Sequence, residues 1–202
     1  MVQANPSHRL PDDILQSIGD GYVVGLDDTV RAKFERLVRW FQGQGRVIVA
    51  LSGGVDSSVV AAVAKMSLDD KAVAVTVKSL TLPPSDLDAA IKVVGFIRIR
   101  HIIVEHDELS NLRVAENPPD RCYFCRSELI SALERIASSE GVETLIDGTN
   151  ADDLKAHRPG VLAMREGGVR SPLAENGFTK MEVRVIARAL HLPNSEKPSN
   201  AC

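Results

Sequence analysis

The chain has 202 residues, of which 44% are hydrophobic and 25% are charged, so it is long enough for an α/β domain with a substantial core. The formal net charge is −3, and no cluster of lysine and arginine stands out. This balance argues against a dedicated nucleic-acid-binding protein and favours a small-molecule partner. No apolar run approaches the roughly 20 residues that cross a bilayer, and the first residues lack the apolar core of a signal peptide. We therefore expect a cytoplasmic protein.

The chain has three cysteines, at positions 122, 125 and 202. An odd number in a protein expected to be cytoplasmic does not indicate a disulfide framework. The CxxC spacing of Cys122 and Cys125 indicates a metal, a cluster or redox chemistry instead. A zinc site would need further cysteine or histidine ligands, and the five histidines show no zinc-finger spacing. The pair therefore leaves the type of site open, with two buried structural thiols as the alternative.

The predicted elements alternate along the chain. Residues 1–28 are expected to form an N-terminal extension with one short helix. Apolar periodicity then predicts helices at 29–42, 57–66, 84–95, 122–139 and 179–190, and apolar runs predict strands at 46–51, 72–77, 98–104 and 144–146. Asp28 or Thr29 is the expected cap of the first helix, and Thr179 with Glu182 forms a capping box for the last. The alternation predicts a doubly wound parallel sheet over residues 29–202, with ligands bound beyond the carboxyl ends of its strands.

A phosphate-binding loop follows the first strand directly. Gly53 and Gly54 permit close approach of the backbone, and the first amides of the helix that follows point at an anion. The loop is not a Walker motif, because no lysine follows the glycines. A carboxylate at position 56 is a poor phosphate neighbour unless a magnesium ion bridges the two. The predicted nucleotide-binding residues of this loop are Ser52, Gly53, Gly54, Val55, Asp56, Ser57 and Ser58, with Asp56 as the magnesium ligand.

Two further segments carry candidate site residues. Cys122 and Cys125 open a helix, where the helix N-terminus lowers the pKa of a thiol and favours thiolate ligands. The segment 147–153, with sequence DGTNADD, follows the fourth strand at the expected ligand edge. Its side chains could hold a metal or orient a nucleotide, or simply cap a helix, and a following arginine could bind an anion by a bidentate contact. The candidate nucleotide-binding residues here are Gly148, Asn150, Asp153 and Arg158.

The loop sequence SGGVDS resembles that of the N-type ATP pyrophosphatases, or PP-loop enzymes. That superfamily includes NAD and GMP synthetases, argininosuccinate synthetase and tRNA-thiolating enzymes. The resemblance implies that ATP is cleaved between its α- and β-phosphates. Pyrophosphate would lie in the loop, and AMP would be transferred to a substrate oxygen.

The order of all the motifs resembles one group within that superfamily. SGGVDS, RCYFC, DGTNADD, RPG, SPL and the terminal KPSNAC are similar to the LarE-type sulfurtransferases that act on pyridinium-3,5-biscarboxylic acid mononucleotide. The resemblance covers roughly residues 30–202. It implies that a substrate carboxylate is adenylated and then receives sulfur to form a thiocarboxylate, a step in building the nickel-pincer nucleotide cofactor.

Two sulfur sources occur in that group. In one subgroup, a cysteine matching Cys202 gives up its own sulfur; in the other, three cysteines hold a 4Fe–4S cluster whose open iron carries a sulfide. Cys122, Cys125 and Cys202 match the second pattern, so the resemblance favours an iron–sulfur cluster, with Cys202 as a catalytic residue beside Asp56. The sacrificial use of Cys202 is the alternative.

The resemblance also implies a homo-oligomer. Members of the group continue past this cysteine into a region that binds substrate and builds oligomers, and that region is expected to be missing after residue 202. Other functions remain open: a tRNA thiolase of the same superfamily, an ammonia-using amidating synthetase that needs no cysteines, and a non-catalytic nucleotide-binding module. The last would bind ATP without releasing pyrophosphate.

Overall fold

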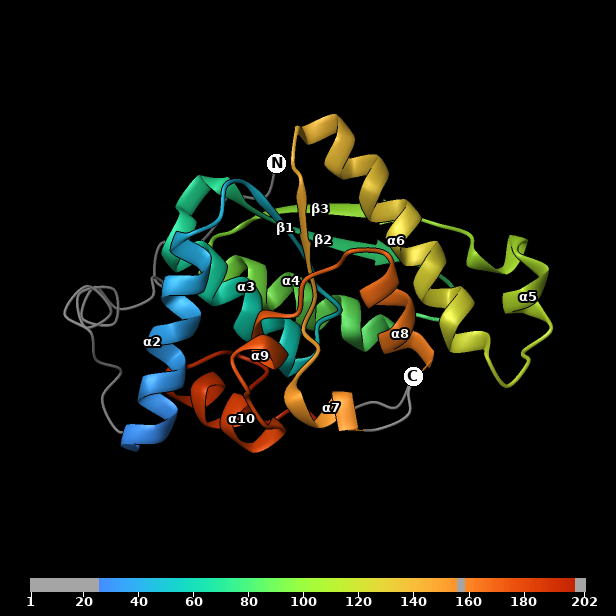
Figure 1. The fold of residues 1–202 in the computed structure, drawn as a ribbon. Coiled ribbons are helices and arrows are strands. Elements are labelled where there is room, and N and C mark those ends of the chain that lie inside the picture. Colours follow the sequence, from blue (N-terminus) through green and yellow to red (C-terminus); the bar gives the residue numbers. More distant parts are fainter. Residues whose placement is uncertain (1–25, 156–158, 199–202) are drawn as a thin grey trace.

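A computed structural model describes residues 26–155 and 159–198. Its centre is a sheet of four parallel strands: β1 (Val47–Ala50), β2 (Ala72–Lys78), β3 (Arg100–Glu105) and β4 (Thr144–Ile146). The strand order is β3-β2-β1-β4. From β1 the chain adds β2 and β3 on one side, and β4 then pairs with β1 on its other side (Figure 1). The direction of winding therefore reverses between β1 and β4, which is where such sheets bind ligands.

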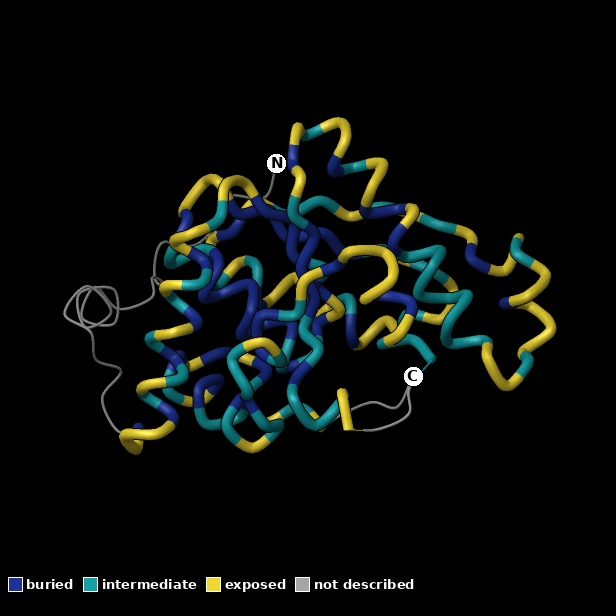
Figure 2. The backbone as a smooth tube through the Cα atoms, in the orientation of Figure 1, coloured by how far each residue is buried: buried dark blue, intermediate teal, exposed yellow. Residues whose placement is uncertain are grey.

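Helices cover both faces of the sheet. On one face, α2 (Asp28–Gln42), α3 (Val55–Leu68), α4 (Pro84–Ile97) and α10 (Lys180–Ala189) pack on a large apolar core that includes alternate residues of β1. On the other face, α6 (Arg121–Glu140) and α8 (Pro159–Glu166) pack on a smaller core built around Ile48. Figure 2 shows the buried backbone running through the strands and the central helix α3. The predicted doubly wound α/β fold is confirmed.

The buried character of the strands follows from their composition. Every residue of β1 except its last is fully buried, and the first four residues of β2 are buried as well. A strand covered by helices on both faces has no solvent side, so its sequence is continuously apolar rather than alternating. This is why the apolar runs at 46–51 and 72–77 predicted strands of a parallel sheet.

Several boundaries differ from the sequence-based expectation. The cap of α2 is Asp27, whose carboxylate accepts hydrogen bonds from the amides of Thr29 and Val30, so the prediction of Asp28 or Thr29 was wrong. Helix α4 runs through Gly95 and ends at Ile97, with Arg98 in a left-handed conformation as its C-cap, and β3 begins two residues later than predicted. The capping box of Thr179 and Glu182 is confirmed.

Short helical elements that the sequence did not reveal fill the connections. They are η1 (Asp69–Lys71), η2 (Glu108–Ser110), α5 (Leu112–Ala115), α7 (Ala151–Lys155) and α9 (Pro172–Glu175). Within the described residues, no helix is both long and apolar enough to span a membrane. The predicted extension at 1–28 lies almost wholly outside the described residues.

The turn after β4 packs directly on the start of α3. A Cβ atom built on Gly148 would lie 2.6 Å from the amide nitrogen of Ser57 and 2.9 Å from its Cα atom. Both are backbone atoms that cannot move aside without shifting the helix. Glycine at this position therefore allows the loops that follow β1 and β4 to meet at the reversal point of the sheet.

We predict that Gly148→Ala lowers the free energy of unfolding by about 1–3 kcal/mol, because the added methyl group overlaps helix backbone. Chemical denaturation measures this. Gly95→Ala is the matched control: Gly95 is an exposed helical residue with nothing within 4 Å of a built Cβ atom. That change should raise stability by up to about 1 kcal/mol, because alanine is the better helix former. Equal stability of Gly148→Ala and the wild type would contradict the close packing.

Candidate functional site

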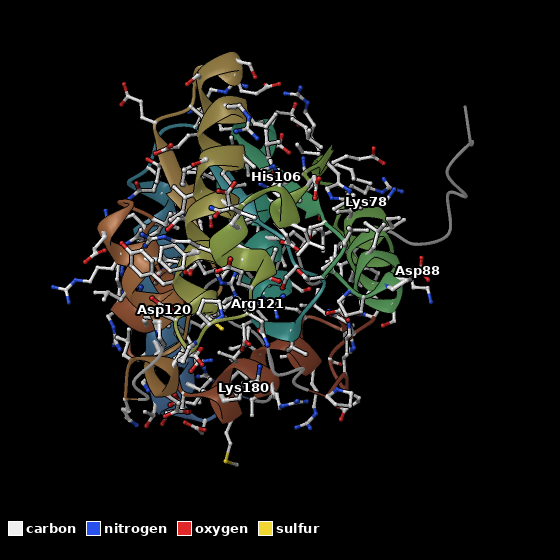
Figure 3. All side chains as sticks on the ribbon, turned by 90° about the vertical axis from the view of Figure 1, so that its right-hand side faces the viewer. Lys78, Asp88, His106, Asp120, Arg121 and Lys180 are labelled. Carbon is white, nitrogen blue, oxygen red and sulfur yellow. The ribbon has the colours of Figure 1, made fainter. Side chains whose placement is uncertain are left out.

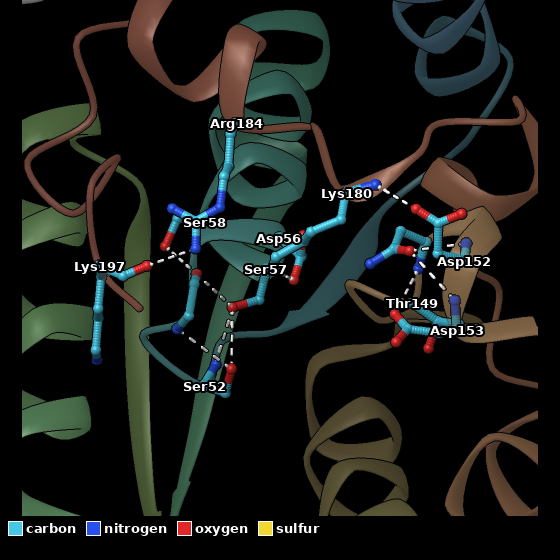
Figure 4. Close-up of polar contacts among 12 residues, drawn as sticks. Ser52, Asp56, Ser57, Ser58, Thr149, Asp152, Asp153, Lys180, Arg184 and Lys197 are labelled. Atoms are coloured by element: carbon cyan, nitrogen blue, oxygen red, sulfur yellow. Dashed lines mark hydrogen bonds and ion pairs between the residues drawn. The ribbon is translucent and has the colours of Figure 1, made fainter. Parts of the chain in front are cut away.

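The loop between β1 and α3 is shaped by its own serines (Figure 4). Ser57 Oγ lies 3.2 Å from Ser52 Oγ and donates to the carbonyl oxygen of Gly54 at 3.2 Å. Ser58 Oγ donates to the same carbonyl at 2.7 Å. The Gly54 carbonyl is therefore turned toward the helix, where it also accepts the amide of Ser58.

Glycine at both positions keeps the loop narrow. Gly53 has a φ of +75°, and a Cβ atom built on it would lie 2.0 Å from the carbonyl oxygen of Asp86 in α4. Gly54 is the N-cap of α3 and provides no side chain to cap it. The amides of Val55, Asp56 and Ser57 form the first turn of α3, where a helix leaves N–H groups without intrahelical partners. The start of α3 can therefore bind an anion through its backbone.

Asp56 projects from the first turn of α3 toward α10. One carboxylate oxygen pairs with the ammonium group of Lys180, and the other is buried with no hydrogen-bond partner among the described residues. Burial raises the pKa of the Asp56 carboxyl above its usual value, although Lys180 opposes this shift. An anionic oxygen that is buried and unpartnered is suited to a hard cation such as magnesium.

The turn after β4 forms the second wall of the site. The buried Asp147 accepts hydrogen bonds from Thr149 Oγ1 at 2.6 Å and Ser171 Oγ at 2.7 Å, which fix the turn. Asn150 is almost completely buried, and its side-chain oxygen accepts the amides of Asp152 and Asp153. Asn150 thus caps the start of α7, as the alternative interpretation of this segment allowed.

The acidic residues of α7 connect this wall to α10. Asp152 accepts the backbone amide of Lys180 at 2.9 Å, and hydrogen bonds from Lys155 and from that amide lower the pKa of the Asp152 carboxyl. Asp153 accepts the amide of Asn150 at 3.1 Å, and its charge contributes to the raised pKa of Asp56. Asp153 therefore lies close to the candidate magnesium ligand. The nucleotide-binding roles of Gly148, Asn150 and Asp153 stay predictions.

The C-terminal segment forms a third wall that sequence motifs alone did not assign. Asn194 donates to the carbonyl of Gly53 at 3.0 Å and to Ser58 Oγ at 2.9 Å. Lys197 donates to the same Gly53 carbonyl at 3.1 Å and pairs with Asp86 at 2.8 Å. Arg184 of α10 donates to the carbonyl of Lys197 at 3.0 Å. Figure 4 shows Arg184, Lys180 and Lys197 arranged around the loop.

This arrangement places three cations around the loop, two of them paired with the carboxylates of Asp56 and Asp86. The three cations come from α10 and from the segment after it, at least 120 residues beyond the loop, so no local cluster reveals them in the sequence. The sequence indicated only part of this arrangement. Lys197 belongs to the terminal KPSNAC motif, and Lys180 directly follows the helix cap Thr179.

The two described cysteines open α6. Cys122 and Cys125 are half-buried, and the Cys125 thiol donates to a carboxylate oxygen of the buried Glu108 at 3.8 Å. Figure 3 faces the carboxyl edge of the sheet, where Arg121 at the start of α6 and Lys78 at the end of β2 are labelled. The described residues contain no group of three or more potential ligands that could hold a metal ion. Cys202 and Arg158 lie outside the described residues.

Comparisons with known proteins agree with this geometry. The family model for NAD synthase matches residues 29–119. The chain is 43% identical over 173 residues to the uncharacterized protein slr1717 of Synechocystis sp., covering 86% of this chain and 65% of that protein. It is 34% identical to the pyridinium-3,5-bisthiocarboxylic acid mononucleotide synthase of Lactiplantibacillus plantarum, covering 84% of this chain and 62% of that protein. The chain thus spans somewhat less than two thirds of the length of each relative.

A solved structure confirms the fold. The NH3-dependent NAD synthetase from Campylobacter jejuni superposes with a TM-score of 0.65 at 20% identity, covering 84% of this chain and 76% of that one. The NAD synthase model includes the glycine loop and the first three strands, and the two curated relatives extend the likeness over most of the chain. The chain is therefore similar to the NAD synthase family over the part that carries the glycine loop and the first three strands, and similar over most of its length to the pyridinium-3,5-bisthiocarboxylic acid mononucleotide synthase.

Proposed function

We propose that this chain is the ATP-binding part of a sulfurtransferase that adenylates a carboxylate of pyridinium-3,5-biscarboxylic acid mononucleotide and replaces the AMP with sulfur. The observation that carries the proposal is the uncapped start of α3 with three cations around it. The similarity to the mononucleotide synthase supports the choice of substrate, and the cysteines at the start of α6 support sulfur chemistry.

The first step needs a site for the β- and γ-phosphates of ATP. The amides of Val55, Asp56 and Ser57 would bind these phosphates, with Lys180 and Lys197 neutralising part of their charge. A magnesium ion held by Asp56 and the phosphates would supply further stabilisation of the leaving pyrophosphate. The buried, unpartnered oxygen of Asp56 fits this role. The substrate carboxylate attacks the α-phosphorus, which yields an acyl adenylate and pyrophosphate.

The second step needs a sulfur nucleophile near the adenylate. A sulfur nucleophile attacks the acyl carbon and displaces AMP, leaving a thiocarboxylate. Cys202 is five residues beyond Lys197, which contacts the loop, and five residues of extended chain span at most about 18 Å. The length of the chain therefore limits how far Cys202 can lie from Lys197.

We further propose that Cys122, Cys125 and Cys202 hold a 4Fe–4S cluster as the sulfur source. Two half-buried thiols one helical turn apart suit a shared metal centre, and the carboxylate of Glu108, which accepts a hydrogen bond from Cys125, can take up the proton when that thiol ionises. The sacrificial use of Cys202 is the second candidate, because the same residue ends the motif shared with the synthase group. Assembly into a homo-oligomer stays a prediction.

The proposal predicts substrate-dependent release of pyrophosphate. In the presence of magnesium, ATP and pyridinium-3,5-biscarboxylic acid mononucleotide, the purified protein should release pyrophosphate and AMP in equal amounts, measured by a coupled phosphate assay and chromatography. Ammonia or tRNA in place of the mononucleotide should give no stimulation. Binding of ATP with no pyrophosphate release under any of these conditions would identify a nucleotide-binding module instead.

The variant Asp56→Asn tests the catalytic role of this carboxylate through pyrophosphate release, and the effect of its burial through the free energy of unfolding. We expect pyrophosphate release to fall by about 100-fold or more, because charge stabilisation at the leaving group is lost. Without nucleotide, the free energy of unfolding at pH 7 should stay level or rise, because a buried amide costs less than a buried carboxylate. The pKa of Asp56 is raised in the folded protein, so its carboxyl takes up a proton at a higher pH than in the unfolded chain, and this gain should shrink as the pH falls through the raised pKa toward the ordinary value of 3.8. Unchanged pyrophosphate release would remove Asp56 from the mechanism.

The sulfur source is tested by iron and sulfide analysis of protein purified without oxygen. We expect bound iron and sulfide in the wild type, and their loss in Cys122→Ala, Cys125→Ala and Cys202→Ala. Substrate-dependent pyrophosphate release should persist in all three variants, because adenylation precedes sulfur transfer. Absence of iron from active wild-type protein, with Cys202 lighter after turnover by the mass of one hydrogen sulfide molecule, would favour the sacrificial route.

A further inference from the structure

The carbonyl group of Gly53 is held by two side chains from the far end of the chain. Asn194 and Lys197 both donate to it, at 3.0 and 3.1 Å. The Gly53 carbonyl can only accept hydrogen bonds, so the atom of Asn194 that contacts it is the amide nitrogen. Asn194 is buried, which removes water as a competing partner for these contacts.

The same amide group holds the next carbonyl through a serine. Asn194 donates its second proton to Ser58 Oγ at 2.9 Å, and Ser58 Oγ in turn donates to the Gly54 carbonyl at 2.7 Å. Asn194 therefore restrains two consecutive carbonyl groups, the first directly and the second through Ser58. Both donor protons of the side chain are used in these contacts.

Restraining these carbonyls fixes the direction of the amides that follow them. In a trans peptide group the C=O and the N–H point in opposite directions, and the described chain has no cis peptide bond. The Gly54 amide therefore points away from Asn194, and the Val55 amide points away from Ser58 Oγ. Gly54 N–H donates to Ser52 Oγ at 3.4 Å. The amides are set in this direction before any anion binds.

We infer that Asn194 is a positioning residue for the phosphate loop: it holds the Gly53 carbonyl directly and the Gly54 carbonyl through Ser58, and so orients the Val55 amide for the pyrophosphate group of ATP. The inference rests on the proposed function. Lys197 assists at the Gly53 carbonyl, and Arg184 holds the segment in place through the carbonyls of Ser195 and Lys197. The loop is thus complete only when the segment 194–197 is docked on it.

The test compares Asn194→Ala with Asn194→Asp by calorimetric titration with inorganic pyrophosphate and, separately, with AMP. Asn194→Ala removes the donors, and pyrophosphate affinity should fall by about tenfold, the effect of losing a pair of neutral hydrogen bonds. Asn194→Asp keeps the shape but places a carboxylate oxygen against the Gly53 carbonyl, so its affinity should fall further. AMP affinity should change by less than about twofold in both, since AMP has no pyrophosphate to use these amides.

Glu196→Gln is the matched control. Glu196 belongs to the same segment but bonds to Arg188 on the surface at 2.6 Å, so both affinities should match those of the wild type. Thermal unfolding checks that each variant folds, and if Asn194→Asp does not, Asn194→Ala alone carries the comparison of pyrophosphate with AMP. The inference is overturned if Asn194→Asp binds pyrophosphate as the wild type does, or if pyrophosphate and AMP affinities fall together. A wild-type chain that binds no pyrophosphate overturns the proposed function itself.

Discussion

The backbone at the start of α3 has to remain open to an anion while it is surrounded by protein. Two glycines satisfy this constraint by removing side chains where chains meet: Gly53 packs against the carbonyl of Asp86, and Gly148 packs against the amide of Ser57. A methyl group at either position would push a neighbouring backbone away. The loops after β1 and β4 can therefore approach each other closely enough to form one site at the reversal point of the sheet.

The charged side chains around this site form ion pairs that a bound nucleotide could replace with contacts of its own. Lys180 pairs with Asp56 and Lys197 pairs with Asp86 in the structure. Burial raises the pKa of the Asp56 carboxyl, so its negative charge is held at a cost that a bound cation would relieve. A polyphosphate with magnesium would offer new partners to both the lysines and the carboxylate. These residues would then stabilise the fold through ion pairs when the site is empty, and would bind the nucleotide and its magnesium ion when it is filled.

The C-terminal segment links the phosphate loop to the sulfur chemistry proposed for this chain. Asn194 and Lys197 contact the loop, and the motif that ends in Cys202 continues from them along the chain. The cysteines of α6 open a helix at the carboxyl edge of the same sheet. A site assembled from these three parts of the chain would bring nucleotide and sulfur together, although the loop, the helix and the terminus are far apart in sequence.

The sequence by itself determined the strands, the main helices and the phosphate loop, because each depends on a local pattern: continuous apolar runs, helical periodicity, and glycines between a strand and a helix. It also predicted site residues at Asp56 and in the turn at 147–153 from local patterns, and their nucleotide-binding roles stay predictions. Only the tertiary structure decided the strand order, the pairing of Lys180 with Asp56 and the contacts of Asn194 with the loop. These contacts join residues more than 100 positions apart, and a local pattern carries no information about which distant side chain will meet a given carbonyl. Folding the sheet is what brings them within hydrogen-bonding distance.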